Sequence, residues 1–258
     1  MRHIYKTFPG VKALQNVDFT LKKGEIHALM GENGAGKSTL MKIMTGVYTK
    51  DSGKVIIKGE EKEIKSTNDA KENGIAMIFQ EMSLVPSLTI AENIFLGYEL
   101  KKHGMRDVKL MKQETEKVLK RLGLDLDPGT PVSELSVGLC QMVEIAKAVS
   151  KNASILVFDE PSAALSDSET EFLFKMIRQL KEEGVSMVYI SHRMNEILEI
   201  CDRVTVIRDG KKVITEKVEN LTMEEIVAQM MGNEAKETKF EYVPRAVSYT
   251  HLRAHETP

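Results

Sequence analysis

Residues 31–39 have the types and the spacing that are needed to hold a chain of phosphates. They read Gly-Glu-Asn-Gly-Ala-Gly-Lys-Ser-Thr, which matches the pattern G-x-x-x-x-G-K-[ST] at every defined position. The glycines allow successive backbone N–H groups to point at a triphosphate, Lys37 reaches its β- and γ-phosphates, and the Ser38 hydroxyl ligates Mg²⁺. The residues expected to bind the phosphates of a nucleotide are Gly31, Asn33, Gly34, Ala35, Gly36, Lys37, Ser38 and Thr39.

The residues around this loop favour the same interpretation. An apolar run at 26–30 precedes it, and apolar residues at 40, 41, 43 and 44 follow it. This pattern predicts a strand, a loop and then a helix whose N-terminus faces the phosphates. A glycine-rich turn inside a core is the alternative, and the strand–loop–helix context argues against it.

Two acidic residues, Asp159 and Glu160, directly follow an aliphatic run at 155–158. In a protein with a phosphate loop, an acid at such a strand end can hold Mg²⁺, usually through water. An adjacent glutamate can polarise the attacking water as a general base. We therefore expect Asp159 to join Ser38 at a metal and Glu160 to act in catalysis. An ordinary strand followed by a charged loop is the alternative.

Three more polar segments occur in an order that fits this chemistry. Gln80 and His192 follow predicted strands at 75–79 and 185–190, so both lie at strand ends that face a ligand crevice. The segment 135–138, Leu-Ser-Val-Gly, opens an apolar helix whose N-terminus is a second place for an anion. A Gln or His after a strand is more often a surface or capping residue, so the joint order carries the prediction.

Composition limits the function classes. The chain has 258 residues, a net charge of −2 and 42% hydrophobic residues, which suits one large domain or two small ones with a real core. The balanced charge does not mark a nucleic-acid binder. Cys140 and Cys201 have no metal or redox spacing and are expected to be buried in a reducing compartment. No signal region or membrane-spanning run is present, so we expect a cytosolic chain that reaches a membrane through a partner.

Apolar spacing and turn residues indicate the elements that position these residues. The predicted strands are 17–21, 25–30, 54–57, 75–79, 155–158, 185–190 and 204–207, with a small edge pair at 211–219. The predicted helices are 89–96, 105–122, 138–149, 166–180, 194–200 and 223–231, with capping boxes at Ser166–Glu169 and Thr222–Glu225. Alternating strands and helices predict a parallel sheet with helices on both faces.

The last residues break this pattern. Residues 246–258 show no periodicity and resemble the translation of a transposase-type sequencing adapter, so we exclude them from the expected fold. On this interpretation the natural protein continues past Arg245, and the chain is a fragment. A genuine disordered tail is the alternative.

Taken in order, these motifs resemble those of the ATP-binding cassette (ABC) ATPases over residues 3–240. The resemblance implies an α/β fold of the ABC type, with a parallel-sheet core, an N-terminal antiparallel β subdomain, a helical subdomain at 82–150 and a linker from 241. The implied motifs are the Walker A loop at 31–39, the Q-loop at Gln80, the signature at 135–139, the Walker B strand at 155–160, the D-loop at 163–166 and the switch histidine His192. It also implies that Phe8 stacks on adenine, although such a Phe more often packs in a core or loop.

The resemblance further implies that a single cassette is half an active site. A second cassette covers the ATP bound here with its own signature helix, and Ser136 and Gly138 of this chain meet the γ-phosphate bound to that second cassette. The implied catalytic residues are Lys37, Gln80, Glu160 and His192, and the implied metal ligands are Ser38, Gln80 and Asp159. Gln80 links the nucleotide to a permease that contacts residues 82–104.

Within the family, the chain is most similar to the ATPases of bacterial monosaccharide importers of the ribose and galactose type. The strings at 7–14, 88–97, 141–147 and 189–194 carry this likeness. Those ATPases resemble two fused cassettes, and this chain corresponds to the first. The implied partners are an integral-membrane sugar permease, a second cassette and, indirectly, a periplasmic or lipoprotein sugar-binding protein, with no nucleic acid. The implied location is the cytoplasmic face of the plasma membrane.

The chain departs from the family pattern at three places. Its signature reads Leu-Ser-Val-Gly-Leu at 135–139, so Leu139 replaces the usual Gln, and its D-loop ends in Ser166 instead of Asp. The second change puts the usual D-loop contact across the dimer in doubt. The chain also begins late, within the strand that normally precedes Tyr5.

Two other functions compete with sugar import. A soluble ABC ATPase that acts on ribosomes or DNA is the first, although the stretch 82–134 is too short for a DNA-repair coiled coil. A phosphate-loop kinase is the second, but it leaves Ser136, Gly138 and His192 without a role.

Overall fold

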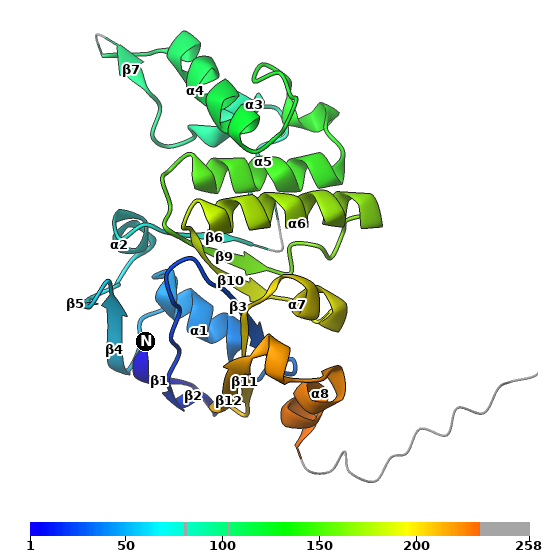
Figure 1. Ribbon diagram of the computed structural model, residues 1–258. Helices are drawn as coiled ribbons and strands as arrows, with labels where there is room; N and C mark the ends of the chain where they lie inside the picture. The colour runs from blue at the N-terminus through cyan, green and yellow to red at the C-terminus, as the bar shows by residue number, and fades with distance from the viewer. Residues whose placement is uncertain (80–81, 103, 233–258) are drawn as a thin grey trace, which may run out of the picture.

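The computed structural model describes residues 1–79, 82–102 and 104–232, and it is built around a six-stranded sheet (Figure 1). The strand order is β12-β11-β3-β10-β9-β6, and all neighbours are parallel except the antiparallel pair β11 and β12. The strands are β3 (Ile26–Met30), β6 (Ile75–Ile78), β9 (Ile155–Asp159), β10 (Ser186–Ile190), β11 (Arg203–Arg208) and β12 (Lys211–Lys217). The predicted parallel sheet is confirmed.

The predicted edge pair at 211–219 is wrong, because this segment forms the single strand β12 followed by the short 3₁₀ helix η2 (Val218–Asn220). β12 pairs antiparallel with β11 across the turn at Asp209 and Gly210. The antiparallel pair is therefore formed by β11 and β12, and not by two strands within residues 211–219.

A second, antiparallel sheet holds the N-terminal part of the chain. Its order is β2-β1-β4-β5, formed by β1 (Arg2–Phe8), β2 (Val11–Val17), β4 (Ser52–Ile57) and β5 (Glu60–Lys62). The predicted strand at 17–21 is wrong, since only Val17 lies in β2. Phe8 pairs directly with Val11 across the Pro9-Gly10 turn, which makes β1 and β2 a hairpin. Residues after Val17 leave the sheet, and Phe19 instead exchanges hydrogen bonds with Met1.

Helix α1 (Lys37–Met44) is buried between the two sheets (Figure 1). Its residues Leu40, Met41 and Ile43 pack with Ile4 and Val55 of the antiparallel sheet and with one face of the parallel sheet. The strands supply both sides because successive side chains point to opposite faces. In β3, for example, Leu29 faces α1, whereas Ala28 and Met30 face the other core.

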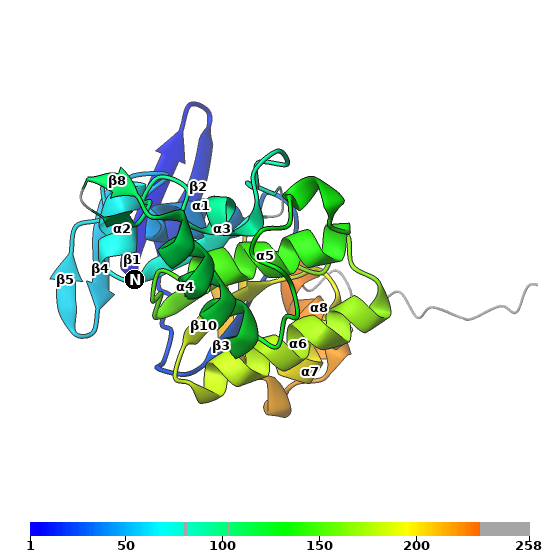
Figure 2. The same ribbon diagram turned by 90° about the horizontal axis from the view of Figure 1, so that it is seen from above.

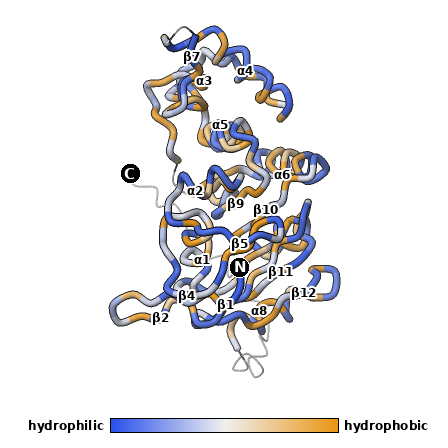
Figure 3. Tube along the Cα trace, turned by 90° about the vertical axis from the view of Figure 1, so that its left-hand side faces the viewer, coloured by the Kyte–Doolittle hydropathy of each residue, from blue (hydrophilic) through white to orange (hydrophobic). Residues whose placement is uncertain are grey.

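The opposite face of the parallel sheet is covered by α5 (Val137–Val149), α6 (Asp167–Glu182) and α7 (Met194–Ile200), and α5 and α6 run side by side in both views (Figures 1 and 2). Farther out, α3 (Ile90–Ile94) and α4 (Val108–Arg121) pack on α5. Figure 3 shows that α4 is mostly hydrophilic, as its exposed position requires. The remaining elements are α2 (Thr67–Glu72), β7 (Lys101–Lys102), β8 (Met105–Arg106), η1 (Val132–Glu134) and α8 (Met223–Met231).

The predicted helix at 105–122 begins later than expected. Met105 and Arg106 pair with Lys102 and Lys101 in a small hairpin, and Asp107 then caps α4 by accepting a hydrogen bond from Leu110 N at 2.9 Å. The two predicted capping boxes are confirmed, at Ser166–Glu169 and at Thr222–Glu225.

Both cysteines are free and buried, as expected, and burial raises the pKa of each thiol. Within the described ranges, none of the helices combines the length and the apolar character that a membrane span requires.

The position of α1 between two sheets predicts a large cost for shortening Met41. Met41→Ala removes a fully buried side chain from a layer that cannot collapse freely, so we expect the free energy of unfolding to fall by about 2–5 kcal/mol. Urea denaturation followed by circular dichroism measures this change. Val47→Ala, at a side chain that is 41% exposed just after the same helix, is the control and should shift it by about 0.5 kcal/mol or less. Equal effects of the two variants would contradict the two-sheet packing of α1.

Candidate functional site

The predicted phosphate loop connects the end of β3 to the start of α1. Gly36 is the N-cap of α1 and has φ of 109°. No capping side chain accepts a hydrogen bond from the first N–H groups of the helix, so these groups are available to a ligand. A Cβ at Gly36 would lie 2.7 Å from Ala13 O, so the hairpin β1–β2 leaves room only for glycine. Ala35 is buried in the same turn, and its carbonyl accepts a hydrogen bond from Gly210 N at 3.0 Å.

Lys37, the first residue of α1, folds back over the loop. Its ammonium donates to the carbonyl of Gly31 at 2.6 Å and to that of Glu32 at 2.9 Å. Burial lowers the pKa of Lys37, and the nearby charges of Glu160 and Asp159 oppose this shift. The Lys37 ammonium is therefore held by backbone carbonyls that a bound polyanion, such as a chain of phosphates, can replace.

The predicted acidic pair follows β9 at the same edge of the sheet. Asp159 is the last residue of β9, and burial followed by the charge of Glu160 raises the pKa of its carboxyl, while Lys37 and Lys42 oppose the shift. Two neighbouring carboxylates beside one lysine make a site that favours a further cation. Within the described residues, no group of three or more Asp, Glu, His or Cys side chains is arranged to hold a metal ion by itself.

Glu160 and His192 lie together above the ends of β9 and β10. Glu160 Oε1 is 3.4 Å from His192 Nδ1, and the imidazole is largely exposed. Glu160 has φ of 50°, in the left-handed region, and its backbone N–H donates to Ile190 O at 2.9 Å. Such a conformation costs energy in a residue other than glycine and is concentrated at functional sites. The neighbouring strand therefore holds Glu160 in a strained orientation toward His192.

A buried carboxylate that the sequence analysis missed supports the His192 segment. Glu196 of α7 accepts hydrogen bonds from the hydroxyls of Tyr189 at 2.9 Å and Ser191 at 2.8 Å, and its side chain is 6% exposed. Ser191 Oγ in turn accepts from Arg193 N at 3.0 Å. Glu196 thus fixes the residues on both sides of His192. Its spacing, four residues after the histidine on a predicted helix, was the available signal.

Ser136 and Gly138 lie in the first turn of the long apolar helix α5. Ser136 is its N-cap and accepts a hydrogen bond from Leu139 N at 3.2 Å, whereas Gly138 is buried against α6. Among the described residues, no hydrogen bond or ion pair joins Ser136 to the 31–39 loop. The first turn of α5 instead meets Glu160 at a cavity of about 410 Å³, which Val137 and Gln141 line with the loop 160–165.

Phe8, which is expected to stack on adenine, lies in the antiparallel sheet. Phe8 ends β1 half-buried, with its ring packed edge-on against Tyr48 at 5.3 Å between centroids and the Lys6 ammonium 5.4 Å from its centroid. Gln80 lies outside the described residues. The strand that precedes it, β6, is the edge neighbour of β9.

Comparison with known sequences gives the family. The family model described as ABC transporter matches residues 14–163. The xylose import ATP-binding protein of Thermoanaerobacter pseudethanolicus is 50% identical over an alignment of 267 residues, which covers 100% of this chain and 53% of that protein. The ribose import ATP-binding protein of Caldanaerobacter subterraneus is 52% identical over 238 residues, which cover 92% of this chain and 48% of that protein. The chain therefore spans about half the length of the curated relatives that it matches.

Solved structures agree with this result. A nucleotide-free ATP-binding cassette from an ABC transporter superposes with a TM-score of 0.78 at 27% identity, over 92% of this chain and 96% of that one. A dimeric cassette in a post-hydrolysis state, bound to ADP and Pi, superposes with a TM-score of 0.72 at 27% identity, over 84% of this chain and 97% of that one. With the family match and both architectures in agreement, the chain belongs to the ABC transporter family.

Proposed function

We propose that this chain is an ATP-binding and ATP-hydrolysing cassette that powers the import of a simple sugar through a membrane permease. The observation that carries the proposal is the identity of about half of all positions with the xylose and ribose import ATP-binding proteins. A galactose/methyl galactoside import ATP-binding protein of Clostridium perfringens is similar to the chain at 49% identity. Because the chain spans about half of these relatives, it acts in this proposal as the first of two cassettes.

ATP binds on the 31–39 loop in this proposal. The backbone N–H groups from Gly31 to Gly36, with Asn33, Gly34 and Ala35 between them, surround the phosphates, and α1 adds the positive end of its dipole. Lys37 exchanges its two carbonyl partners for the β- and γ-phosphates. Ser38 and Thr39 supply hydroxyls at the helix start, and the Phe8 ring stacks on adenine.

Mg²⁺ fits the oxygen donors at this edge. Ser38 and Asp159 would hold it there, and Gln80, which lies outside the described residues, is expected to join them. A site with few protein carboxylates is typical of Mg²⁺ bound together with a nucleotide. The ion supplies charge neutralisation at the β- and γ-phosphates.

Hydrolysis depends on Glu160 and His192. Glu160 accepts a proton from the attacking water as a general base, and its strained backbone fixes the direction from which the water is held. His192, 3.4 Å from this carboxylate, positions the γ-phosphate for the reaction.

Ser136 and Gly138 act on the nucleotide of a second cassette, since their contacts in this chain are with α6. Gln80 links nucleotide occupancy to the permease, which contacts residues 82–104.

Replacing Glu160 tests the catalytic part of the proposal. Glu160→Gln keeps the volume of the side chain and removes the base, so we expect ATP to bind with unchanged Kd while kcat falls by about 100-fold or more. Phosphate release and binding of a fluorescent ATP analogue measure the two quantities. Glu182→Gln, at an exposed position near the end of α6, is the matched control. Hydrolysis that survives in Glu160→Gln would show that another group is the base.

Exchange of half a relative tests sugar import. Residues 1–232 of this chain replace the corresponding half of the xylose import ATP-binding protein, and uptake of labelled xylose is measured in cells that carry its permease. We expect uptake with this chimera and none when it carries Glu160→Gln. A folded, ATP-hydrolysing chimera that supports no uptake would favour an ABC ATPase that acts away from membranes.

The Glu196 contacts predict a separate effect on turnover. Glu196→Ala leaves the buried hydroxyls of Tyr189 and Ser191 without their acceptor, which costs about 1–3 kcal/mol of unfolding free energy. Because Ser191 precedes His192, we also expect kcat to fall by roughly 10-fold with Kd for ATP unchanged. Glu196→Gln retains an acceptor and should recover part of both losses.

Glu199→Ala controls for the helix itself, since Glu199 lies on α7 with an exposed side chain paired to Arg178. It should change neither kcat nor stability measurably. A Glu196→Ala variant that is destabilised but turns over normally would contradict a role of Glu196 in holding His192.

A further inference from the structure

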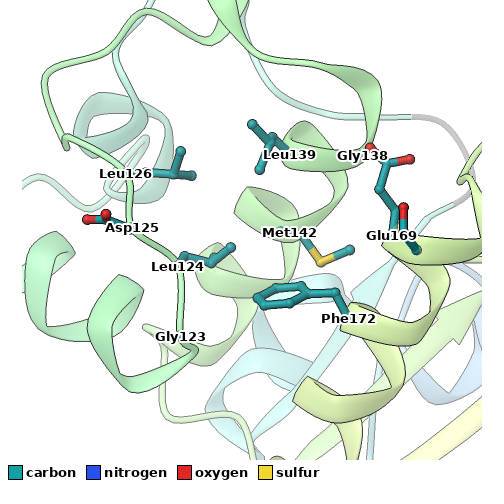
Figure 4. A pocket seen from close by; sticks show the side chains of 10 residues that line it. Gly123, Leu124, Asp125, Leu126, Gly138, Leu139, Met142, Glu169 and Phe172 are labelled. Atoms are coloured by element: carbon teal, nitrogen blue, oxygen red, sulfur yellow. The ribbon is translucent and has the colours of Figure 1, made fainter.

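The first turns of α5 and α6 meet at Gly138 and Glu169, which lie directly against each other in Figure 4. A Cβ built on Gly138 would be 2.0 Å from Glu169 Oε1 and 2.3 Å from its Cδ. The carboxylate of Glu169 therefore occupies the space that any side chain at position 138 would need. An alanine at position 138 would force the Glu169 carboxylate to leave this place and give up the hydrogen bonds that its Oε2 accepts from Ser166.

Glu169 is held in this place by Ser166, the N-cap serine of its own helix. Its Oε2 accepts hydrogen bonds from Ser166 N at 2.9 Å and from Ser166 Oγ at 2.8 Å, which form the capping box of α6. Hydrogen bonds from Ser166 keep the pKa of Glu169 below its usual value. One carboxylate thus caps α6 and also lies against the first turn of α5, whose N-cap is Ser136.

The electrostatics favour the same position. The first turn of α5 reads Val137-Gly138-Leu139-Cys140 and holds no acid of its own. A negative charge near a helix N-terminus is stabilised by the helix dipole. Glu169 therefore provides from α6 the charge that α5 lacks, and it does so at the turn that carries Ser136.

We propose that Glu169 is a positioning residue that fastens the start of α5 to the loop 160–166 and the start of α6. In the dimer of the proposed function, this contact holds Ser136 and Gly138 in the position from which they reach the nucleotide of the other cassette. It also couples these two residues to the segment that begins at Glu160. The glycine at position 138 is required by Glu169 within the chain, in addition to any requirement of the nucleotide.

A double-mutant cycle tests the contact without any assumption about function. The variants are Gly138→Ala, Glu169→Ala and the double variant, with thermal unfolding as the measurement. We expect Gly138→Ala alone to lower Tm by roughly 2–4 °C, as follows from the loss of a capping interaction in a domain of this size. In the Glu169→Ala background the same substitution should cost little, because alanine is the better helix former once the carboxylate is gone. Equal losses in both backgrounds would overturn the proposal.

Turnover tests the positioning role. We expect Glu169→Ala to lower kcat by about 10-fold while Kd for ATP at the 31–39 loop stays unchanged, since the residue acts on the nucleotide of the partner. Glu169→Gln keeps the capping box and should recover much of the loss. The matched control is Glu225→Ala, which removes the equivalent glutamate from the capping box of α8. It should reduce stability similarly and leave kcat unchanged.

Two results would separate the proposals. Equal kcat for Glu169→Ala and Glu225→Ala would overturn the positioning role even if the cycle shows coupling. A wild-type chain that binds but does not hydrolyse ATP in the presence of a second cassette would contradict the proposed function, and the unfolding cycle would still decide whether Glu169 and Gly138 are coupled.

Discussion

The parallel alignment of β3, β10 and β9 is the constraint on which the rest of the structure depends. In this register Tyr189 lies beside Ala28 and Ile190 lies beside Asp159. The three strands are buried on both faces, so a slip by one residue would turn their apolar side chains toward the wrong core. Because the strands also run in the same direction, the segments that follow them arrive at one edge. The phosphate loop, the acidic pair and His192 come together for this reason.

That constraint also explains how much of the site could be predicted. Strands such as 155–158 and 185–190 are continuous aliphatic runs, which in an alternating chain indicate buried parallel strands. Once those strands are assigned, Glu160 and His192 must lie at the same edge, and the structure places them 3.4 Å apart. The phosphate loop was predictable because glycines at fixed spacing mark a backbone shape rather than a side-chain contact.

Elements that depend on contacts distant in sequence were not predictable. The segment around Val17 has the composition of a strand, but its residues after Val17 are held by Met1, which no local pattern reveals. The pair of Glu196 with Tyr189 and Ser191 joins α7 to β10 through side chains alone. Gly138 looked like a phosphate-binding glycine, and only the coordinates show that Glu169 fills its side-chain space.

Two of the departures from the family pattern, at Leu139 and Ser166, have local physical causes. Leu139 replaces the usual Gln, and its side chain lines a pocket of about 280 Å³ with Leu124, Leu126 and Phe172, so an apolar side chain matches these neighbours (Figure 4). Ser166 replaces the usual Asp, and its hydroxyl both caps α6 and donates to Glu169 at 2.8 Å. An aspartate could cap the helix but could not donate, and it would bring a second negative charge against Glu169. Ser166 and Gly138 are therefore both compatible with the Glu169 carboxylate, so substitutions at these two positions should be made together and not one at a time.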